Sequence, residues 1–302
     1  LYLFLPLLVI RKINFASRSL FLYSILLLCL VGASFSIRFF FDSVGSLSDL
    51  GTSQIIALNK DNVALDPATQ FLLSFTSCFS IWLLIRGKIL YGIAILIISF
   101  LPWAVVIGVI SRAPIFFTFF SIILTIFYWI IINQNKKFGV FFVIIASIIL
   151  IYFNDYYIVF FENTLELLIQ KNTRYGLNTR GIEFDVVMNS LNSSILKFFF
   201  GNGWGSLIEI PNMYILRNLH NVFLYFAYKT GFFGLICILI YFIWIIKLVL
   251  SIGFKNKFFL IVMISMINPL INTALLQPMF KSLSFGVLML LIPLMYNLRK
   301  KN

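Results

Sequence analysis

The chain has 302 residues, of which 61% are hydrophobic and 11% charged, and its formal net charge is +13. In an ordinary soluble domain about a quarter of the residues are charged, so this composition excludes that class. The mean hydropathy is +1.03. We expect a single integral membrane domain over residues 1–302, all-α and polytopic, with about eight or nine transmembrane helices.

Apolar runs of membrane length recur along the chain. A bilayer core of about 30 Å needs roughly 20 helical residues, which predicts spans near 19–37, 67–85, 89–110, 114–132, 138–153, 219–246, 258–276 and 281–298. The run 1–10 is too short to cross and is expected to be the end of a span whose start is missing, so the N-terminus is expected to be truncated. Asp66 and Pro67 are expected to cap the second span, and Pro102 to kink the third.

The charged residues indicate the orientation, because Lys and Arg accumulate in short cytoplasmic loops. If the spans alternate, one side of the membrane holds all ten acids. The bases of the acid-free side are Arg11, Lys12, Arg18, Arg86, Lys88, Lys136, Lys137, Lys247, Lys255, Lys257, Arg299, Lys300 and Lys301. These bases are expected to face anionic membrane lipids, and no nucleic-acid partner is expected. The other side receives two extracytoplasmic loops, a smaller one at 38–66 and a large one at 154–218.

The large loop is a polar interruption of an otherwise apolar chain. Its first part, 156–170, has the spacing of an interfacial amphipathic helix. A basic turn follows, and then a short helix is expected at 182–191, with Thr179 as its cap. Glu183 and Asp185 lie early in that helix, where acids are favourable.

Three glycines fall within residues 201–205, and they indicate backbone that turns sharply or approaches another segment closely. Trp204 lies among them. It is either laid on the membrane interface by the turn, or it stacks on a sugar. These two alternatives stay open on the sequence.

The only histidine, His220, follows this loop at the start of an apolar run longer than a bilayer needs. The excess length would let the first turn stand above the hydrocarbon. If that turn is helical, Arg217 and His220 share a face. A lone histidine at an interface is most often a polar anchor. The neighbouring motifs make a catalytic role a stronger hypothesis for His220.

Four segments, in one order along the chain, resemble the O-antigen polymerase and O-antigen ligase superfamily of bacterial envelope polysaccharide enzymes. They are Ser111-Arg112-Ala113, Thr179-Arg180-Gly181, Phe200-Gly201-Asn202-Gly203-Trp204-Gly205, and His220-Asn221-Val222-Phe223-Leu224 with Gly231-Phe232-Phe233-Gly234. The resemblance covers roughly residues 82–244. The aromatic residue that the family has soon after the loop arginine is Phe184 at best, which leaves the register around Arg180 open.

The resemblance implies a metal-independent glycosyltransferase without a cofactor, which polymerises undecaprenyl-diphosphate-linked oligosaccharide into O-antigen or capsule-type polysaccharide. It implies the bacterial cytoplasmic (inner) membrane, with the active site facing the periplasm or exterior. Candidate partners are a flippase and a chain-length regulator of the same pathway.

The chemistry of such a transfer selects the candidate residues. Negative charge develops on the leaving diphosphate, and arginine stabilises it with a permanent charge and a planar fork of donors. Arg112 and Arg180 are the first candidates, followed by Arg174 and Arg217. A neutral imidazole can take the proton of the acceptor hydroxyl, so His220 is the candidate base. A single displacement would invert the anomeric centre.

Trp204, Asn221 and Lys229 complete the candidate substrate-binding residues. On a continuous helix Lys229 would face away from His220, and it either lines a groove for the lipid diphosphate or snorkels. Arg112 has an alternative role as a snorkelling anchor. Arg180 has one as a structural partner of Glu183 or Asp185.

Three other functions stay open. An O-antigen ligase, which transfers the polymer to lipid A core, needs the same arginines and base. A metal-dependent glycosyltransferase would use Asp42 and Asp49, although their surroundings have no recognisable ligand pattern. A lipid or solute transporter or flippase is disfavoured because no acid lies within a predicted span.

Overall fold

A computed structural model describes residues 2–10, 18–41, 65–108, 111–133, 178–210, 214–216, 219–252 and 256–301. Most of these residues are helical, as predicted for an all-α membrane protein. Five of the described helices are long and apolar enough to cross a membrane. They are α2 (Arg18–Phe39), α4 (Pro67–Ile85), α5 (Ile89–Gly108), α11 (Val222–Ile252), and α12 (Lys257–Ile271) with its π-helical extension η4 (Asn272–Leu276).

The other described elements include two further apolar helices, α6 and α13, and several short elements. They are η1 (Tyr2–Phe4), α1 (Leu5–Ile10), α6 (Arg112–Asn133), α9 (Asn178–Asn192), α10 (Ile195–Phe200), β1 (Ile208–Ile210), β2 (Tyr214–Leu216) and α13 (Leu283–Lys301). The two strands pair antiparallel, and this hairpin was not predicted. The predicted span 138–153, the amphipathic helix 156–170 and most of the loop 38–66 lie outside the described residues.

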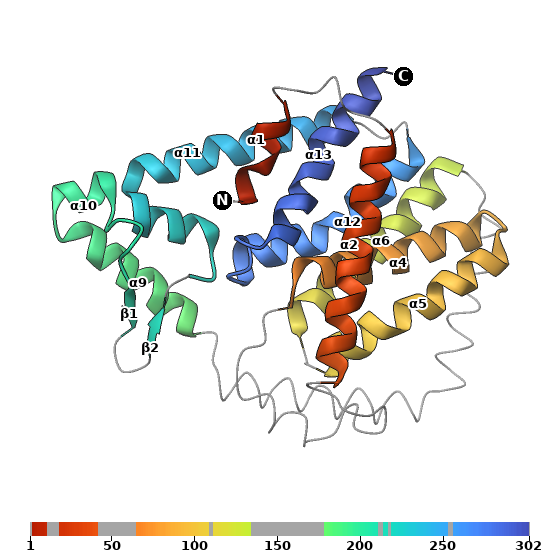
Figure 1. The fold of residues 1–302 in the computed structure, drawn as a ribbon, viewed down its shortest axis with the longest axis horizontal. Coiled ribbons are helices and arrows are strands. Elements are labelled where there is room, and N and C mark those ends of the chain that lie inside the picture. Colours follow the sequence, from red (N-terminus) through yellow and green to blue (C-terminus); the bar gives the residue numbers. More distant parts are fainter. Residues whose placement is uncertain are drawn as a thin grey trace. The chain divides into compact units, whose positions relative to one another are not determined.

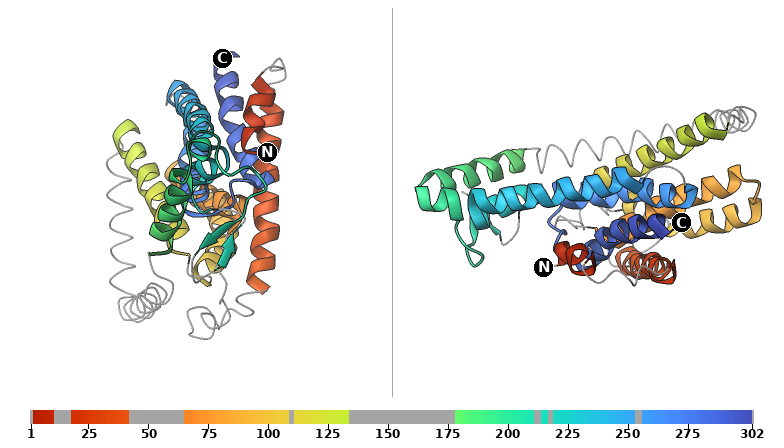
Figure 2. Two further views of the ribbon diagram at one scale, coloured as in Figure 1. Left: turned by 90° about the vertical axis from the view of Figure 1, so that its left-hand side faces the viewer. Right: turned by 90° about the horizontal axis from the view of Figure 1, so that it is seen from above.

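The described chain forms two compact units. The second unit comprises Leu26–Lys171 and Asn256–Pro269. Within it α4 packs against α5 and α6, and Figure 2 shows α4 (orange) beside α5 (yellow-orange). Asp66 caps α4 as predicted, because its side chain accepts a hydrogen bond of 2.8 Å from the backbone of Ala68, with Pro67 in the first turn. Gly87, with φ of 75°, turns the chain between α4 and α5.

Buried hydrogen bonds join the apolar helices of this second unit. The Asn268 side-chain amide of α12 donates to the hydroxyl oxygens of Ser74 in α4 and Thr118 in α6, at 2.9 Å each. The two hydroxyl groups are themselves 3.1 Å apart. Where lipid tails are as apolar as leucine, such contacts help to hold helices together.

The first unit comprises Leu1–Ile25, Asn172–Lys255 and Leu270–Asn302. In it α9, α10 and the hairpin gather around the start of α11 (Figure 1). At another place α13 packs against η1, α1 and α11. Gly286 of α13 allows the close approach, since a Cβ there would lie 2.6 Å from the backbone oxygen of Tyr2. The Tyr241 hydroxyl of α11 donates to the backbone oxygen of Leu3.

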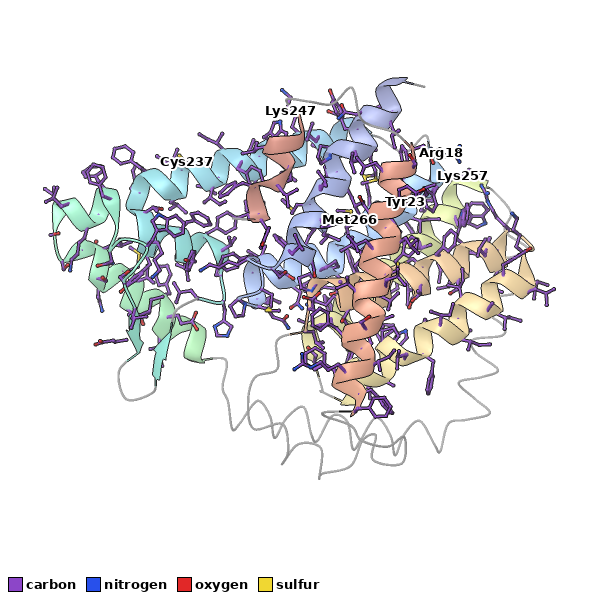
Figure 3. All side chains as sticks on the ribbon, viewed as in Figure 1. Arg18, Tyr23, Cys237, Lys247, Lys257 and Met266 are labelled. Atoms are coloured by element: carbon purple, nitrogen blue, oxygen red, sulfur yellow. The ribbon has the colours of Figure 1, made fainter. Side chains whose placement is uncertain are left out.

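A glycine divides α11 into two segments. Gly231 has φ of 67° and ψ of −159°, which no helix accommodates. The prediction of one continuous run is therefore wrong here. A short helix, 222–230, precedes the break, and a longer one, 232–252, follows it. Cys237 and Lys247, labelled in Figure 3, lie on the longer segment, which alone has the length of a span.

Candidate active site

The candidate base, His220, is held by a carboxylate that the sequence did not assign to the site. One Glu183 oxygen, Oε1, lies 2.5 Å from His220 Nδ1, and the other, Oε2, accepts a hydrogen bond of 3.3 Å from the His220 backbone N–H. The Glu183 side chain is 1% exposed, and that of His220 is 23% exposed. The carboxylate is therefore buried behind the ring, and the imidazole remains partly open to solvent.

The position of His220 follows from how α11 begins. Asn221 caps the helix, because its side-chain oxygen accepts from the backbone N–H of Phe223 at 2.8 Å and that of Leu224 at 3.4 Å. His220 lies in a bend just before the cap. The condition under which Arg217 and His220 would share a helical face is therefore not met, because the helix begins at Val222, after the cap residue.

Glu183 approaches His220 from α9. This helix begins at Asn178, four residues before the predicted start, so Thr179 is inside it and does not cap it. Gly181 forms part of the helix despite its unfavourable helix propensity. Glu183 and His220 are 37 residues apart in the sequence, so tertiary packing alone brings them together.

The glycine turn fits against the break in α11. Since Gly231 interrupts the helix, the carbonyl oxygens of Tyr228 and Lys229 lose their regular partners four residues on. They accept instead from the backbone N–H groups of Asn202, at 2.8 Å, and Gly203, at 3.0 Å. The turn therefore completes the hydrogen bonding of the broken helix. The third and fourth segments of the family resemblance meet at this contact.

Lys229 lies in the short helical segment, and 2% of it is exposed. Its ammonium group donates to the backbone oxygen of Ser206, directly after the glycine turn, and lies 3.4 Å from the Ser206 hydroxyl oxygen. It also lies 5.8 Å and 5.6 Å from the ring centres of Tyr225 and Tyr228. The ammonium group thus contacts other residues of the first unit. Whether Lys229 lines a groove or snorkels in a membrane stays a prediction.

Trp204 is 61% exposed, and one side of its ring packs on α11. Its ring centre lies 6.1 Å from that of Tyr225 and 5.8 Å from that of Phe226. The turn holds this indole outward because Gly203, with φ of 84°, adopts a left-handed conformation beside it. An indole fixed on one side and open on the other is suited to stack on a sugar or to lie at a membrane interface.

The predicted arginines are distributed over both units. Arg180 belongs to α9, three residues before Glu183, and Arg112 is the first residue of α6 in the second unit. Arg174 and Arg217 lie outside the described residues. Among the described residues, no cluster of three or more His, Cys, Asp or Glu could hold a metal ion. Asp42 and Asp49, the alternative metal ligands, lie outside that part of the chain.

Comparison of the chain with protein-family models, with curated proteins and with solved structures found no match.

Proposed function

We propose that the chain is a membrane-embedded glycosyltransferase that extends undecaprenyl-diphosphate-linked oligosaccharide by inverting transfer, with His220 as general base. The observation that carries the proposal is the contact of both Glu183 carboxylate oxygens with His220. A buried carboxylate behind a partly exposed imidazole is the arrangement that orients a histidine for proton transfer.

The tautomer of His220 follows from this contact. An ionised carboxylate can only accept, so Nδ1 carries the proton and Nε2 keeps a lone pair for the acceptor sugar. In the transfer Nε2 takes the hydroxyl proton while the oxygen attacks the anomeric carbon from the face opposite the diphosphate. The bond from that carbon to the diphosphate breaks, and undecaprenyl diphosphate leaves with its electron pair. Glu183 stabilises the imidazolium that forms.

The leaving diphosphate needs positive charge, and the chain offers several basic residues. Arg112 and Arg180 remain our first candidates, with Arg174 and Arg217 next. Lys229 supports the same role, because it lies beside the glycine turn and within the first turns of the helix that Asn221 caps. Trp204 is proposed to stack on a sugar of the substrate.

We also propose the placement of this site. The chain would lie in the bacterial cytoplasmic (inner) membrane with about eight or nine spans, and the loop 154–218 would face the periplasm or exterior. Proposed partners are membrane lipids, a flippase and a chain-length regulator. The reaction would need neither a metal nor another cofactor.

The test is extension of purified lipid-linked repeat units by the purified protein, with and without EDTA. We expect polymer from the wild type under both conditions, and loss of polymer in His220→Ala, Arg112→Ala and Arg180→Ala with normal folding. Retained polymerisation in His220→Ala would contradict the role of His220 as the base, and absence of polymer from the wild type would favour a transporter. Loss in EDTA would favour the metal-dependent reaction.

Polymerase and ligase share this chemistry and differ in the acceptor. Deletion of the gene separates them in cells. A polymerase deletion leaves single-repeat surface glycan, as we propose, whereas a ligase deletion accumulates long lipid-linked polymer.

A further inference from the structure

A short helix of the first unit carries apolar side chains on all of its sides. It is α10 (Ile195–Phe200), and every one of its residues is exposed. Five of the six are large and hydrophobic, and Ile195, Leu196 and Phe200 are 78%, 71% and 64% exposed. A helix on the surface of a soluble domain buries an apolar face and turns a polar one to water. Lys197 is the only polar residue of α10, so the helix has no such polar face.

The exposed apolar surface of α10 continues onto α11 (Figure 1). The ring of Phe198 stacks on that of Phe232 with centres 5.8 Å apart, and the ring centre of Phe200 lies 5.6 Å from that of Phe233. Phe232 and Phe233 are 42% and 51% exposed. They begin the segment 232–252, which follows the break and has the length of a span. The surface of α10 is therefore continuous with the apolar surface of a helix that can cross a membrane.

The backbone at both ends of α10 is hydrogen-bonded within the protein, as a bilayer requires of any segment that enters it. Ser194 caps the first turn, because its hydroxyl oxygen accepts at 3.2 Å from the backbone N–H of Lys197. At the other end the N–H of Gly201 donates to the carbonyl oxygen of Lys197 at 2.8 Å. The next two N–H groups, of Asn202 and Gly203, bond to carbonyl oxygens of α11. These groups therefore need no water.

We propose that α10 is inserted among the acyl chains of one leaflet of the membrane, without crossing it. Six helical residues extend about 9 Å, whereas the hydrocarbon core is about 30 Å thick. Acyl chains are the occupant of this surface because they must also cover the span with which it is continuous. Lys197 can lay its apolar stem on the helix and reach the headgroups. Insertion of α10 requires no substrate, so it does not depend on the proposed glycosyl transfer.

The test places a fluorescent label on α10 in vesicles of phosphatidylcholine and phosphatidylglycerol. The purified protein, in a background without the native cysteines, carries bimane on Phe200→Cys. A nitroxide on the acyl chain of added phosphatidylcholine quenches labels in the bilayer, and iodide quenches labels in water. Ile243→Cys, at a site 63% exposed in the segment 232–252, is the lipid-facing reference. Ser193→Cys, at an exposed site just before α10, is the matched control on the water side.

We expect the nitroxide lipid to quench the label on Phe200→Cys nearly as strongly as that on Ile243→Cys. Iodide should quench the same label several-fold less than the label on Ser193→Cys. Equal iodide quenching of Phe200→Cys and Ser193→Cys would overturn the proposal, because α10 would then lie in water. Quenching by neither reagent would also overturn it, in favour of a second copy of the chain or another protein that covers α10.

A charge placed on α10 gives an independent test. Leu196 is exposed, so Leu196→Asp should keep the fold in detergent, whereas an ionised carboxylate is costly among acyl chains. We expect Leu196→Asp to lower the nitroxide quenching of Phe200→Cys several-fold and to raise its iodide quenching. Ser193→Asp, which adds the same charge just outside the helix, should change neither. Unchanged quenching in Leu196→Asp, or an equal change in both variants, would overturn the proposal. Ile195→Asp replaces Leu196→Asp if the latter unfolds at a lower temperature in detergent.

Discussion

Gly201 and Gly231 lie backbone against backbone, although one follows α10 and the other belongs to α11. A Cβ atom on Gly201 would lie 2.5 Å from the carbonyl carbon of Lys229, and one on Gly231 would lie 2.4 Å from that of Phe199. Both glycines have positive φ, of 74° and 67°. Neither neighbouring atom can move aside as the tip of a side chain would, so the contact accepts glycine alone on each side.

Replacement of either glycine should therefore destabilise the fold. We expect Gly201→Ala and Gly231→Ala to lower the free energy of unfolding by about 1–3 kcal/mol or more, from the strained φ and the backbone clash. The measurement is thermal unfolding in detergent. Gly205→Ala is the control, because nothing lies within 4 Å of a Cβ there and its φ is not positive. Equal stability of Gly201→Ala and Gly205→Ala would contradict the close backbone contact between Gly201 and Gly231.

Lys281, in the turn before α13, donates a hydrogen bond to the Tyr225 hydroxyl and should make folding stability depend on alkaline pH. Its pKa is lowered below the ordinary 10.5 by burial and by Lys229, so the folded protein releases this proton at a lower pH than the unfolded chain. Stability contributed by this group therefore rises with pH, between the lowered pKa and 10.5. Lys281→Met should remove that part of the rise in melting temperature, and Lys197→Met should keep it. If the melting temperatures of the wild type and Lys281→Met change with pH in parallel, the pH dependence does not come from Lys281.

The proposed orientation can be tested by cysteine labelling in intact cells. Ser193 is exposed between α9 and α10, and Asn256 is exposed before α12. In a background without the native cysteines, a membrane-impermeant maleimide should label Ser193→Cys and leave Asn256→Cys unlabelled until the membrane is opened. The native cysteines to be replaced are Cys29, Cys78 and Cys237. The reverse labelling pattern would show that the orientation in the membrane is the opposite of the proposed one.

Glu183 should contribute to catalysis by orienting His220, and not only by stabilising the fold. Glu183→Gln keeps the shape of the side chain and removes its charge, so we expect kcat to fall by roughly 10²–10⁴-fold with little change in KM. Glu183→Asp should recover part of the rate. Asp185→Asn is the matched control, since Asp185 is an exposed acid of the same helix. A similar loss in both amide variants, or a change in KM alone, would count against this role.

Most of the described helices could be predicted because the length of an apolar run is a local property of the sequence. Asp66 and Pro67 also marked the start of α4 correctly, since capping depends on neighbouring residues. The break in α11 could not be predicted from hydropathy, which stays high across Val222–Ile252. It depends on a backbone contact with Gly201, and no local pattern reports such a contact. Each strand of the hairpin, β1 and β2, has only three residues, too few to show an alternation.

The candidate site was predicted only in part, because local sequence properties do not report contacts between distant residues. His220 drew attention as the only histidine, placed after a polar loop. Glu183 was assigned only to the start of a helix, because its contact with His220 is made by tertiary packing. Lys281 was not among the predicted site residues, because its approach to Tyr225 depends on how the turn before α13 packs on α11.

The central claim is that His220 is the base of a glycosyl transfer. Its most direct test compares purified wild type and His220→Ala in the extension of lipid-linked repeat units, with thermal unfolding measured on the same samples. The account predicts that His220→Ala unfolds at nearly the wild-type temperature and forms almost no polymer. Polymer formation by His220→Ala at the wild-type rate would contradict it.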